Sequence, residues 1–243
     1  MSKKIIESGK QKLASEEGFV VKHGASLRVA LCYPNTHAIG MANLGMHTMY
    51  ELFNKIPEVS CERVFLPDDF EMREYEKTRT PLLSLETQTP VRDFDVVAFS
   101  ISFETDYLNM AKMLRLSGIP VWAKDRNHFH PLVVMGGAAS FLNPEPIADF
   151  TDIIAVGEGE ILVYQLVDAI LEHGNKEDIL LNLAQIGRGF YIPSLYDVIY
   201  NDDGTIFGPI SFEQLRQWAL DAQVSPLDKV SNDEKTWIKA PMV

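Results

Sequence analysis

Asp95-Val96-Val97-Ala98-Phe99-Ser100-Ile101-Ser102 is the segment that decides the fold. It is apolar at nearly every position and lacks the alternation of a half-buried strand. This pattern is typical of a central strand in a parallel sheet that is covered on both faces. Shorter apolar segments of the same character lie outward from it, at residues 27–33, 61–66, 132–135 and 152–156. The sequence therefore predicts a parallel sheet.

Segments with apolar residues at helical spacing separate these strands. The spacing predicts helices over residues 42–54, from Thr105 or Asp106 to Ser117, and over 160–172, the last two ended by Gly118 and Gly174. A further short strand is expected at residues 119–122. Alternating strands and helices with short connections predict an α/β fold, a Rossmann-like or flavodoxin-like three-layer domain with helices on both faces of the sheet.

The chain is expected to have three parts. Residues 1–26 form a polar leader, residues 27–174 form the α/β domain, and residues 175–243 form a small α+β extension. Within the extension, residues 176–186 are expected to be a short helix. Residues 191–200 and 205–209 are expected to pair as strands around Asn201-Asp202-Asp203-Gly204, a typical hairpin turn. After Phe212 we expect one helical piece and then a linker.

The composition excludes several classes of protein. The 243 residues are 46% hydrophobic and 23% charged, which excludes bulk disorder. A formal net charge of −12 argues against nucleic acid or an anionic membrane as the main partner. No apolar segment approaches the ~18 residues needed to span a bilayer, and the first residues lack the apolar stretch of an export signal. We expect a cytoplasmic protein without a nucleic-acid or membrane partner.

The chain has two cysteines, Cys32 and Cys61. They are too few for a disulfide framework, a four-thiolate zinc site or a cubane iron–sulfur cluster. Both lie in expected strands, so we interpret them as buried small hydrophobic residues. We expect no iron–sulfur cluster and no catalytic residue in this chain.

An open parallel sheet binds its ligand beyond the carboxyl ends of its strands, where the strand order reverses. Residues 34–40, 100–104 and 136–140 are expected to meet there, with residues 157–160 alongside. A neutral imidazole at His37 can ligate a metal or a metallo-cofactor, and Asn35 can hold that ring in place. The alternative is that His37 is a surface histidine in a polar loop.

Small and polar residues at the other strand ends fit a ligand site. The Ser102 hydroxyl can donate and accept a hydrogen bond at the floor of a cleft. Gly136-Gly137 allow the backbone to approach a bulky planar or extended ligand, because no Cβ intervenes, or they form a plain tight turn. Glu158 and Glu160 invite an acid–base interpretation, although the helix dipole also favours carboxylates in a first turn.

Three short motifs occur in a fixed order on these strands. Their residues are Asn35, His37 and Gly40, then Ser100 or Ser102 with Ile101 or Phe103, then Gly136 and Gly137. This set resembles the cobalamin-binding domain, whose signature is Asp-x-His-x-x-Gly, Ser-x-Leu and Gly-Gly. In that family the His ligates cobalt from below, and the serine and glycines line a slot for the displaced nucleotide tail. The resemblance implies cobalamin as cofactor and His37 as its lower ligand, with Asn in place of Asp.

A second resemblance covers most of the chain. It lies in residues 33–36, 40–45, 81–86, 93–95, 136–137, 143–146 and 157–160. These segments are similar to the amino-terminal part of cobalamin-domain radical S-adenosylmethionine (SAM) proteins. In such proteins the first motif often lacks His, so Leu44-Gly45 matters more to the match. The catalytic half of that family carries Cys-x-x-x-Cys-x-x-Cys, which is absent here, and we expect the chain to stop before that barrel.

The resemblance implies a cobalamin-binding module that works with a radical SAM barrel, in cis or in trans. The implied cofactor-binding residues are Asn35, Thr36, His37, Gly40, Ser100, Ser102, Phe103, Gly136, Gly137, Gly157 and Glu158. One alternative is a cofactor-free scaffold that docks a radical SAM barrel or another protein partner. A second is a flavin-binding, flavodoxin-like domain, with Thr36 and backbone amides at the flavin phosphate.

Other occupants of this architecture fit less well. The first strand is not followed by Gly-x-Gly-x-x-Gly, and no P-loop is present. A receiver domain would carry an aspartate where Ser102 stands. The acidic residues Asp68, Asp69, Glu71, Glu74 and Glu76 are expected to form a solvated patch or a docking face for a basic partner.

Overall fold

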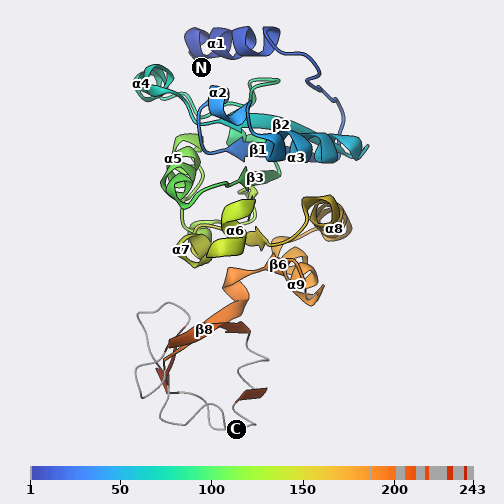
Figure 1. Cartoon of the computed structure of the whole chain (residues 1–243), viewed down its shortest axis with the longest axis vertical. Coiled ribbons are helices and arrows are strands. Elements are labelled where there is room, and N and C mark those ends of the chain that lie inside the picture. The colour runs from blue at the N-terminus through green and yellow to red at the C-terminus, as the bar shows by residue number, and fades with distance from the viewer. Residues whose placement is uncertain are drawn as a thin grey trace. The chain divides into compact units, whose positions relative to one another are not determined.

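The fold is described from a computed structural model of the whole chain (Figure 1). The structure describes residues 2–186, 188–200, 206–211, 217–218, 229–231 and 238–239. The chain divides into two compact units, Met1–Tyr191 and Ile192–Val243. The expected turn at Asn201–Gly204 and nearly all of the expected helical piece after Phe212 lie outside the described residues.

Unit 1 is built on a six-stranded sheet with the order β2-β1-β3-β4-β5-β6. Its strands are β1 (Leu27–Tyr33), β2 (Val59–Phe65), β3 (Val96–Ser100), β4 (Leu132–Gly136), β5 (Ile153–Ala155) and β6 (Phe190–Tyr191). Strands β1 to β5 are parallel, and β6 pairs antiparallel with β5 at one edge. This is the strand order of flavodoxin-like folds, which reverses between β1 and β3. The predicted α/β fold is confirmed.

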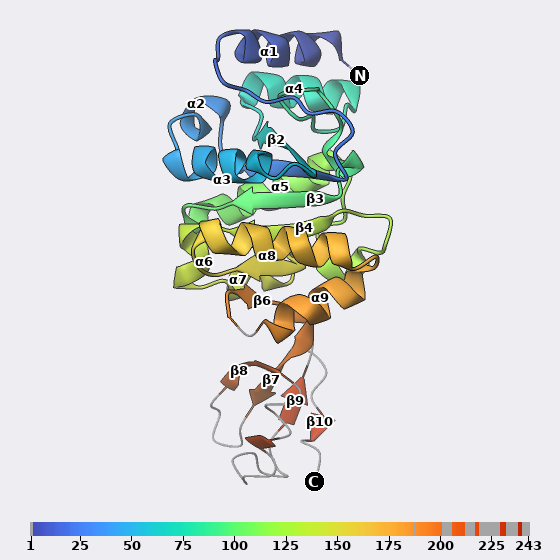
Figure 2. The same cartoon turned by 90° about the vertical axis from the view of Figure 1, so that its right-hand side faces the viewer.

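Helices cover both faces of this sheet (Figure 2). On one face lie α3 (Leu44–Lys55) and α8 (Gly159–Glu172), and on the other lie α5 (Tyr107–Ser117) and α7 (Glu145–Ala148), while α6 (Ala138–Leu142) lies at the carboxyl ends of the strands. We call these the α3/α8 face and the α5 face. Crossover connections between parallel strands are right-handed, so chain segments that leave the β1/β3 switch point in opposite directions place their helices on opposite faces.

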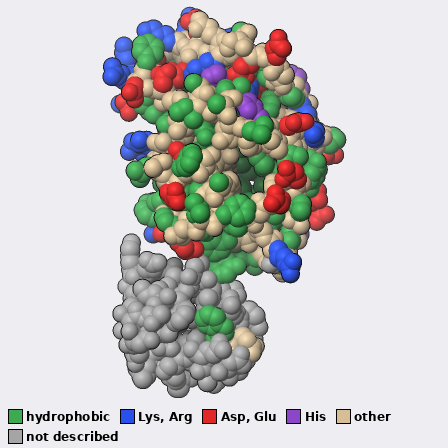
Figure 3. Space-filling model, in the orientation of Figure 1, with side chains coloured by type: hydrophobic (Ala, Val, Ile, Leu, Met, Phe, Trp, Pro, Cys, Tyr) green, Lys and Arg blue, Asp and Glu red, His purple; other side chains and the backbone are tan. Residues whose placement is uncertain are grey.

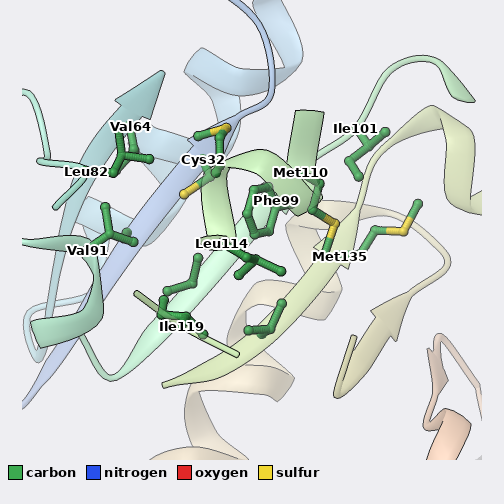
Figure 4. Close-up of a cluster of buried hydrophobic side chains, with 14 of the residues drawn as sticks. Cys32, Val64, Leu82, Val91, Phe99, Ile101, Met110, Leu114, Ile119 and Met135 are labelled. Carbon is green, nitrogen blue, oxygen red and sulfur yellow. The ribbon is translucent and has the colours of Figure 1, made fainter. Parts of the chain in front are cut away.

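The α5 face is filled by large side chains (Figure 4). Val97, Phe99 and Ile101 alternate along β3 and its end, and they pack in one buried cluster with residues of α5 such as Met113 and Leu114. Cys32 belongs to the same cluster, and Cys61 is also fully buried. Both thiols are therefore buried small residues, as predicted.

The expected leader is part of unit 1. It contains helix α1 (Lys3–Ala14), which lies beside α4 (Asp69–Thr78). The buried Ile5 joins the hydrophobic cluster, and Lys12 Nζ and Ser8 Oγ bond the Glu71 carboxylate at 2.5 and 2.6 Å. The acidic stretch is thus helical. Its N-terminus has a capping box between Asp68 and Glu71, a signal present in the sequence as Asp-Asp-Phe-Glu.

The strand expected at residues 119–122 does not form. These residues lie in an irregular connection that leads to a 3-10 turn at Ala123–Asp125. The buried Arg126 guanidinium donates to the carbonyl oxygens of Pro120 and Val121 at 3.0 and 3.1 Å. Those carbonyls are therefore satisfied by a side chain rather than by a neighbouring strand.

Residues 175–191 also lie in unit 1, whereas the sequence places an extension from residue 175 onward. Helix α9 (Lys176–Gln185) contacts α8, and β6 completes the sheet. In unit 2, β7 (Tyr196–Tyr200) pairs antiparallel with β8 (Ile206–Ser211), as expected for the hairpin. Strands β9 (Lys229–Ser231) and β10 (Ile238–Lys239) join them in one sheet.

Two leucines of α5 provide a test of the packing. Leu114 is fully buried in the cluster, whereas Leu108 is 74% exposed. We predict that Leu114→Ala lowers the free energy of unfolding by about 2–5 kcal/mol, because it removes buried apolar surface and leaves a cavity. Urea unfolding followed by circular dichroism measures this change. Leu108→Ala, on the same helix, is the control and should change stability by less than about 1 kcal/mol; equal losses would contradict the described core.

Candidate functional site

A cavity of about 560 Å³ lies between the α3/α8 face of the sheet and the two helices that cover it. It reaches the carboxyl ends of β3, β4 and β5, where doubly wound folds bind their ligands. Its size is within the range of ~300–1,000 Å³ found for ligand pockets. Figure 3 shows this side of the molecule hollowed, with hydrophobic and acidic side chains around the hollow.

The floor of the cavity includes very small residues beside Leu31 of β1 and Val134 of β4. Ala98 and Ser100 of β3, Gly136 of β4 and Ala155 of β5 line it. Successive strand residues point to opposite faces, so their neighbours pack in the cluster on the α5 face. Short side chains on the floor cannot reach the helices above. The cavity follows from this difference in size between the two faces of the same strands.

Helices α3 and α8 form the walls. The first two turns of α3 contribute Leu44, Gly45, Thr48 and Met49, and α8 contributes an apolar row that includes Leu162 and Leu166. At Gly159, which opens α8, a Cβ would lie 2.6 Å from Met49 Sδ. The two helices thus approach closely beside the cavity, and a larger residue at Gly159 would displace the Met49 side chain.

The start of α3 is fixed by the side chain of Asn43. Its Oδ1 accepts a hydrogen bond from the Met46 backbone N–H at 2.8 Å, which caps the helix. Its Nδ2 donates to the hydroxyl oxygens of Ser102 and Tyr33, both at 3.3 Å. Asn43 therefore ties the α3 wall to the ends of β1 and β3.

The lining is apolar and carries no positive charge. Among its described residues, the charged groups are Glu158 and Glu160, which lie at the N-terminus of α8. A phosphate inside this cavity would lack a Lys or Arg partner, whereas a neutral, flat group would meet matching apolar walls. Across the described part of the chain, no three His, Cys, Asp or Glu side chains gather as metal ligands.

The structure brings together part of the predicted site. Ser100, Gly136, Gly137, Gly157 and Glu158 line the cavity, as do Leu44 and Gly45 from the second resemblance. The other predicted residues are not among its lining: Asn35, Thr36, His37, Gly40, Ser102 and Phe103. Of these, Ser102 is joined to the wall through Asn43, and Phe103 is exposed beyond the end of β3.

His37 makes its contacts elsewhere. It begins the short helix α2 (His37–Gly40), and its Nε2 lies 2.6 Å from Glu16 Oε1. Its ring meets Phe65 edge-on, with centroids 5.0 Å apart. Asn35, expected to hold the imidazole, instead accepts a hydrogen bond from the Thr36 backbone N–H. The carboxylate that contacts His37 therefore belongs to Glu16 of the leader. The spacing of residues within the motif could not predict a partner from that distant segment.

Two of the three motif glycines stand where a Cβ would clash with a neighbouring segment. A Cβ at Gly40 would lie 2.4 Å from the Phe65 ring. Gly137 has φ +106°, and a Cβ there would lie 2.5 Å from the carbonyl oxygen of Ile101. At Gly136 the nearest atom would be Ala155 Cβ at 3.7 Å, an ordinary contact. Gly137 thus lets the ends of β3 and β4 interlock, while Gly136 leaves the cavity open.

Asp106, at the N-terminus of α5, has a role that differs from the expected helix cap. Its side chain makes no capping hydrogen bond, and its buried Oδ2 has no hydrogen-bond partner. Burial raises the pKa of this carboxyl, and hydrogen bonds from the Phe103 backbone and the Asn35 side chain act in the opposite direction. Asp106 is therefore a buried carboxyl at the start of α5 rather than a helix cap.

Comparison with known proteins identifies the family. A family model described as "Radical SAM proteins, N-terminal" matches residues 45–193, more than half of the chain. The chain belongs to this family. It is also 26% identical over 134 residues to an uncharacterized protein of Methanocaldococcus jannaschii, MJ0966, a match that covers 54% of this chain. The match spans about a quarter (24%) of the length of that relative.

The matched region contains the cavity walls, from Gly45 of α3 through α8. The radical SAM part of the resemblance is therefore confirmed. No helix among the described residues has both the length and the apolar character needed to cross a membrane.

The glycine pair provides a test of the site geometry. We predict that Gly137→Ala lowers the free energy of unfolding by about 2 kcal/mol or more, because the new methyl group meets the Ile101 backbone at a positive φ. Gly136→Ala is the matched control and should change stability by less than about 1 kcal/mol, since its Cβ has room. Thermal and urea unfolding of both variants measure the difference; similar losses would contradict the described interlock.

Proposed function

We propose that this chain is the cobalamin-binding module of a radical-SAM-type enzyme system and is not catalytic alone. The observation that supports this proposal is the apolar cavity at the carboxyl ends of the parallel strands, with Ser100, Gly136 and Gly137 in its lining. These are residues that the resemblance to cobalamin-binding domains implies for the nucleotide slot. The chain belongs to the family of radical SAM N-terminal regions, and the resemblance implies a radical SAM barrel as the catalytic partner of such a module.

The residues present fit the base of a corrinoid's nucleotide tail. A benzimidazole-type base is flat, neutral and apolar, and the walls offer it Leu44, Met49 and Leu162, while the charged groups of the lining, Glu158 and Glu160, lie at the N-terminus of α8. The Ser100 hydroxyl is a polar group that can orient the base, and the Thr48 hydroxyl, which donates to the Leu44 carbonyl oxygen at 3.1 Å, can still accept a hydrogen bond. When bound, the cobalt of such a cofactor supplies a centre for methyl-group or electron transfer. This chain's residues would bind the tail, orient the ring and exclude water from the slot.

The proposal places the tail in the cavity without a cobalt ligand from His37. The imidazole Nε2 is engaged by Glu16, and His37 is not part of the cavity lining. Cobalt ligation by His37 is therefore left out of the proposed function. The corrinoid would be held by its tail and by contacts around its edge.

Exposed apolar residues form a rim around the strand ends, and this rim supports the proposal that a catalytic partner docks there. Leu44, Phe103, Phe141, Leu142 and Ile161 are all exposed, on α3, the β3–α5 loop, α6 and α8. Exposed apolar residues gathered at one place are typical of an interaction surface. We propose that a radical SAM barrel, in cis or in trans, covers this rim and encloses the cofactor.

Hydroxocobalamin binding tests the proposed function. We predict that the purified chain retains hydroxocobalamin through gel filtration at tens of micromolar, with a changed visible spectrum. Ala98→Leu should weaken retention at least about ten-fold, because the added side chain occupies the cavity floor and displaces the ligand. Ala14→Leu adds the same atoms at an exposed position of α1 and is the matched control.

The outcomes separate the alternatives. Lack of co-elution would overturn the proposal and favour a cofactor-free scaffold, and binding of flavin mononucleotide instead would favour the flavodoxin-like alternative. His37→Ala should leave the spectrum of the bound corrinoid unchanged. A changed cobalt spectrum in that variant would show that His37 moves from Glu16 to the metal on binding.

A further inference from the structure

Arg63 of β2 lies where five segments of unit 1 meet. Its side chain is 3% exposed. Its Nε donates to Glu86 Oε1 at 2.6 Å, one terminal nitrogen lies 2.7 Å from Glu16 Oε2, and the other lies 3.3 Å from Met41 Sδ. The guanidinium also stacks 4.9 Å from the ring centroid of Tyr50 on α3. One side chain therefore joins the leader, the α2–α3 connection, α3, β2 and the loop that carries Glu86.

The loop at residues 81–90 is shaped to bring Glu86 to Arg63. The Leu85 backbone N–H donates to the Arg63 carbonyl oxygen at 2.8 Å, and Ser84 N–H donates to Thr89 O at 2.9 Å. The Glu86 carboxylate also accepts the Arg63 backbone N–H at 2.7 Å. Burial raises the pKa of Glu86, and the charge and hydrogen bonds of Arg63 oppose that shift. This loop contains residues 81–86, one of the segments on which the family resemblance rests.

The same cluster holds His37. Glu16 bridges the two groups, because one carboxylate oxygen meets Arg63 and the other meets His37. His37 begins α2, and its carbonyl accepts the Met41 backbone N–H at 2.9 Å. Both ends of the segment 37–41 are thus attached to the Arg63 cluster. Glu16, His37, Arg63 and Glu86 are called the brace below.

The brace contacts a segment that leads directly into the cavity wall. Met41 precedes Asn43, which caps α3, and Leu44 and Gly45 then line the cavity. Tyr50, on which Arg63 stacks, lies one turn beyond Met46 on the same helix. A helix whose first turn and second turn are both held cannot shift along the sheet. A fixed α3 in turn keeps a constant gap to the strands beneath it.

We propose that the brace positions the start of α3 and so sets the width of the cavity, with Arg63 and Glu86 as positioning residues. The role in ligand binding rests on the proposed function, whereas the role in fixing α3 does not. None of the four side chains is part of the cavity lining. They act on a ligand through Met41, Asn43 and the helix that follows.

A second buried pair in unit 1 is a matched control. Arg126 and Asp152 have side chains that are 0% and 2% exposed. Asp152 accepts the Arg126 Nε at 3.2 Å and the Val133 backbone N–H at 2.8 Å, as Glu86 accepts one guanidinium and one strand N–H, and it also accepts Lys176 Nζ at 2.7 Å. This pair lies at the amino ends of β4 and β5, away from the cavity lining. Loss of either pair should cost comparable global stability.

The experiment compares Glu86→Gln with Asp152→Asn by hydrogen exchange of the whole chain, without ligand. We expect Glu86→Gln to speed amide exchange over residues 41–49 about ten-fold or more. The variant removes the charge-assisted hydrogen bond that fixes Arg63, and Arg63 contacts Met41 and Tyr50 at this segment. Asp152→Asn should leave that segment within about two-fold of the unmodified chain. Glu16→Gln, which spares the Arg63–Glu86 contact, is the second variant and should speed the same segment if Glu86→Gln does not fold.

A further measurement is the affinity for hydroxocobalamin at a temperature where all variants are folded. Glu86→Gln should weaken binding about ten-fold or more, while Asp152→Asn should not. Equal exchange over residues 41–49 in Glu86→Gln and Asp152→Asn would overturn the brace, as would unchanged exchange in Glu16→Gln. If the unmodified chain does not bind hydroxocobalamin, the proposed function fails and the exchange result alone decides the brace.

Discussion

From Ala98 onward, strand β3 presents large side chains to one face of the sheet and small ones to the other, and this contrast shapes both the core and the site of unit 1. Val97, Phe99 and Ile101 pack in the buried cluster below α5. Ala98 and Ser100 lie between them on the opposite face and leave the cavity floor short. Because successive residues of a strand alternate between faces, one run of seven or eight residues carries both roles.

This contrast explains how much the sequence reveals. The continuous apolar run at residues 95–102 predicts a central strand, and the structure places β3 in the interior of the sheet. The size alternation within that run is also visible in the letters, yet apolarity alone hides it, because alanine and phenylalanine both count as buried residues. The glycines at 136–137 and 157 could be predicted at the site, because they follow buried strands at the edge where ligands bind.

His37 shows where prediction from a motif ends. Its spacing from Asn35 and Gly40 suggests a partner within the motif, but the carboxylate that reaches it is Glu16, from a segment interpreted as a leader. Likewise Glu86 and Arg63 are separated by a loop with no helical or strand period, and they meet only because β2 lies beside that loop. Buried ion pairs between distant segments leave no periodic signal in the sequence, since each partner is one residue among several charged neighbours.

The structure also shows that glycines of the same motifs have different roles, which the motifs alone do not distinguish. Gly45, Gly136 and Gly157 line the cavity, and Gly40 allows close approach of Phe65 from outside it. Gly137 has both roles, because it lines the cavity and allows close approach of the Ile101 backbone. Such close contacts hold the loops in place, as the Arg63 cluster does for α3. Part of a family signature can therefore serve to build the loops rather than to touch what the loops hold. Under the proposed function, an imidazole engaged by Glu16 and a slot for a nucleotide tail are compatible properties of one domain.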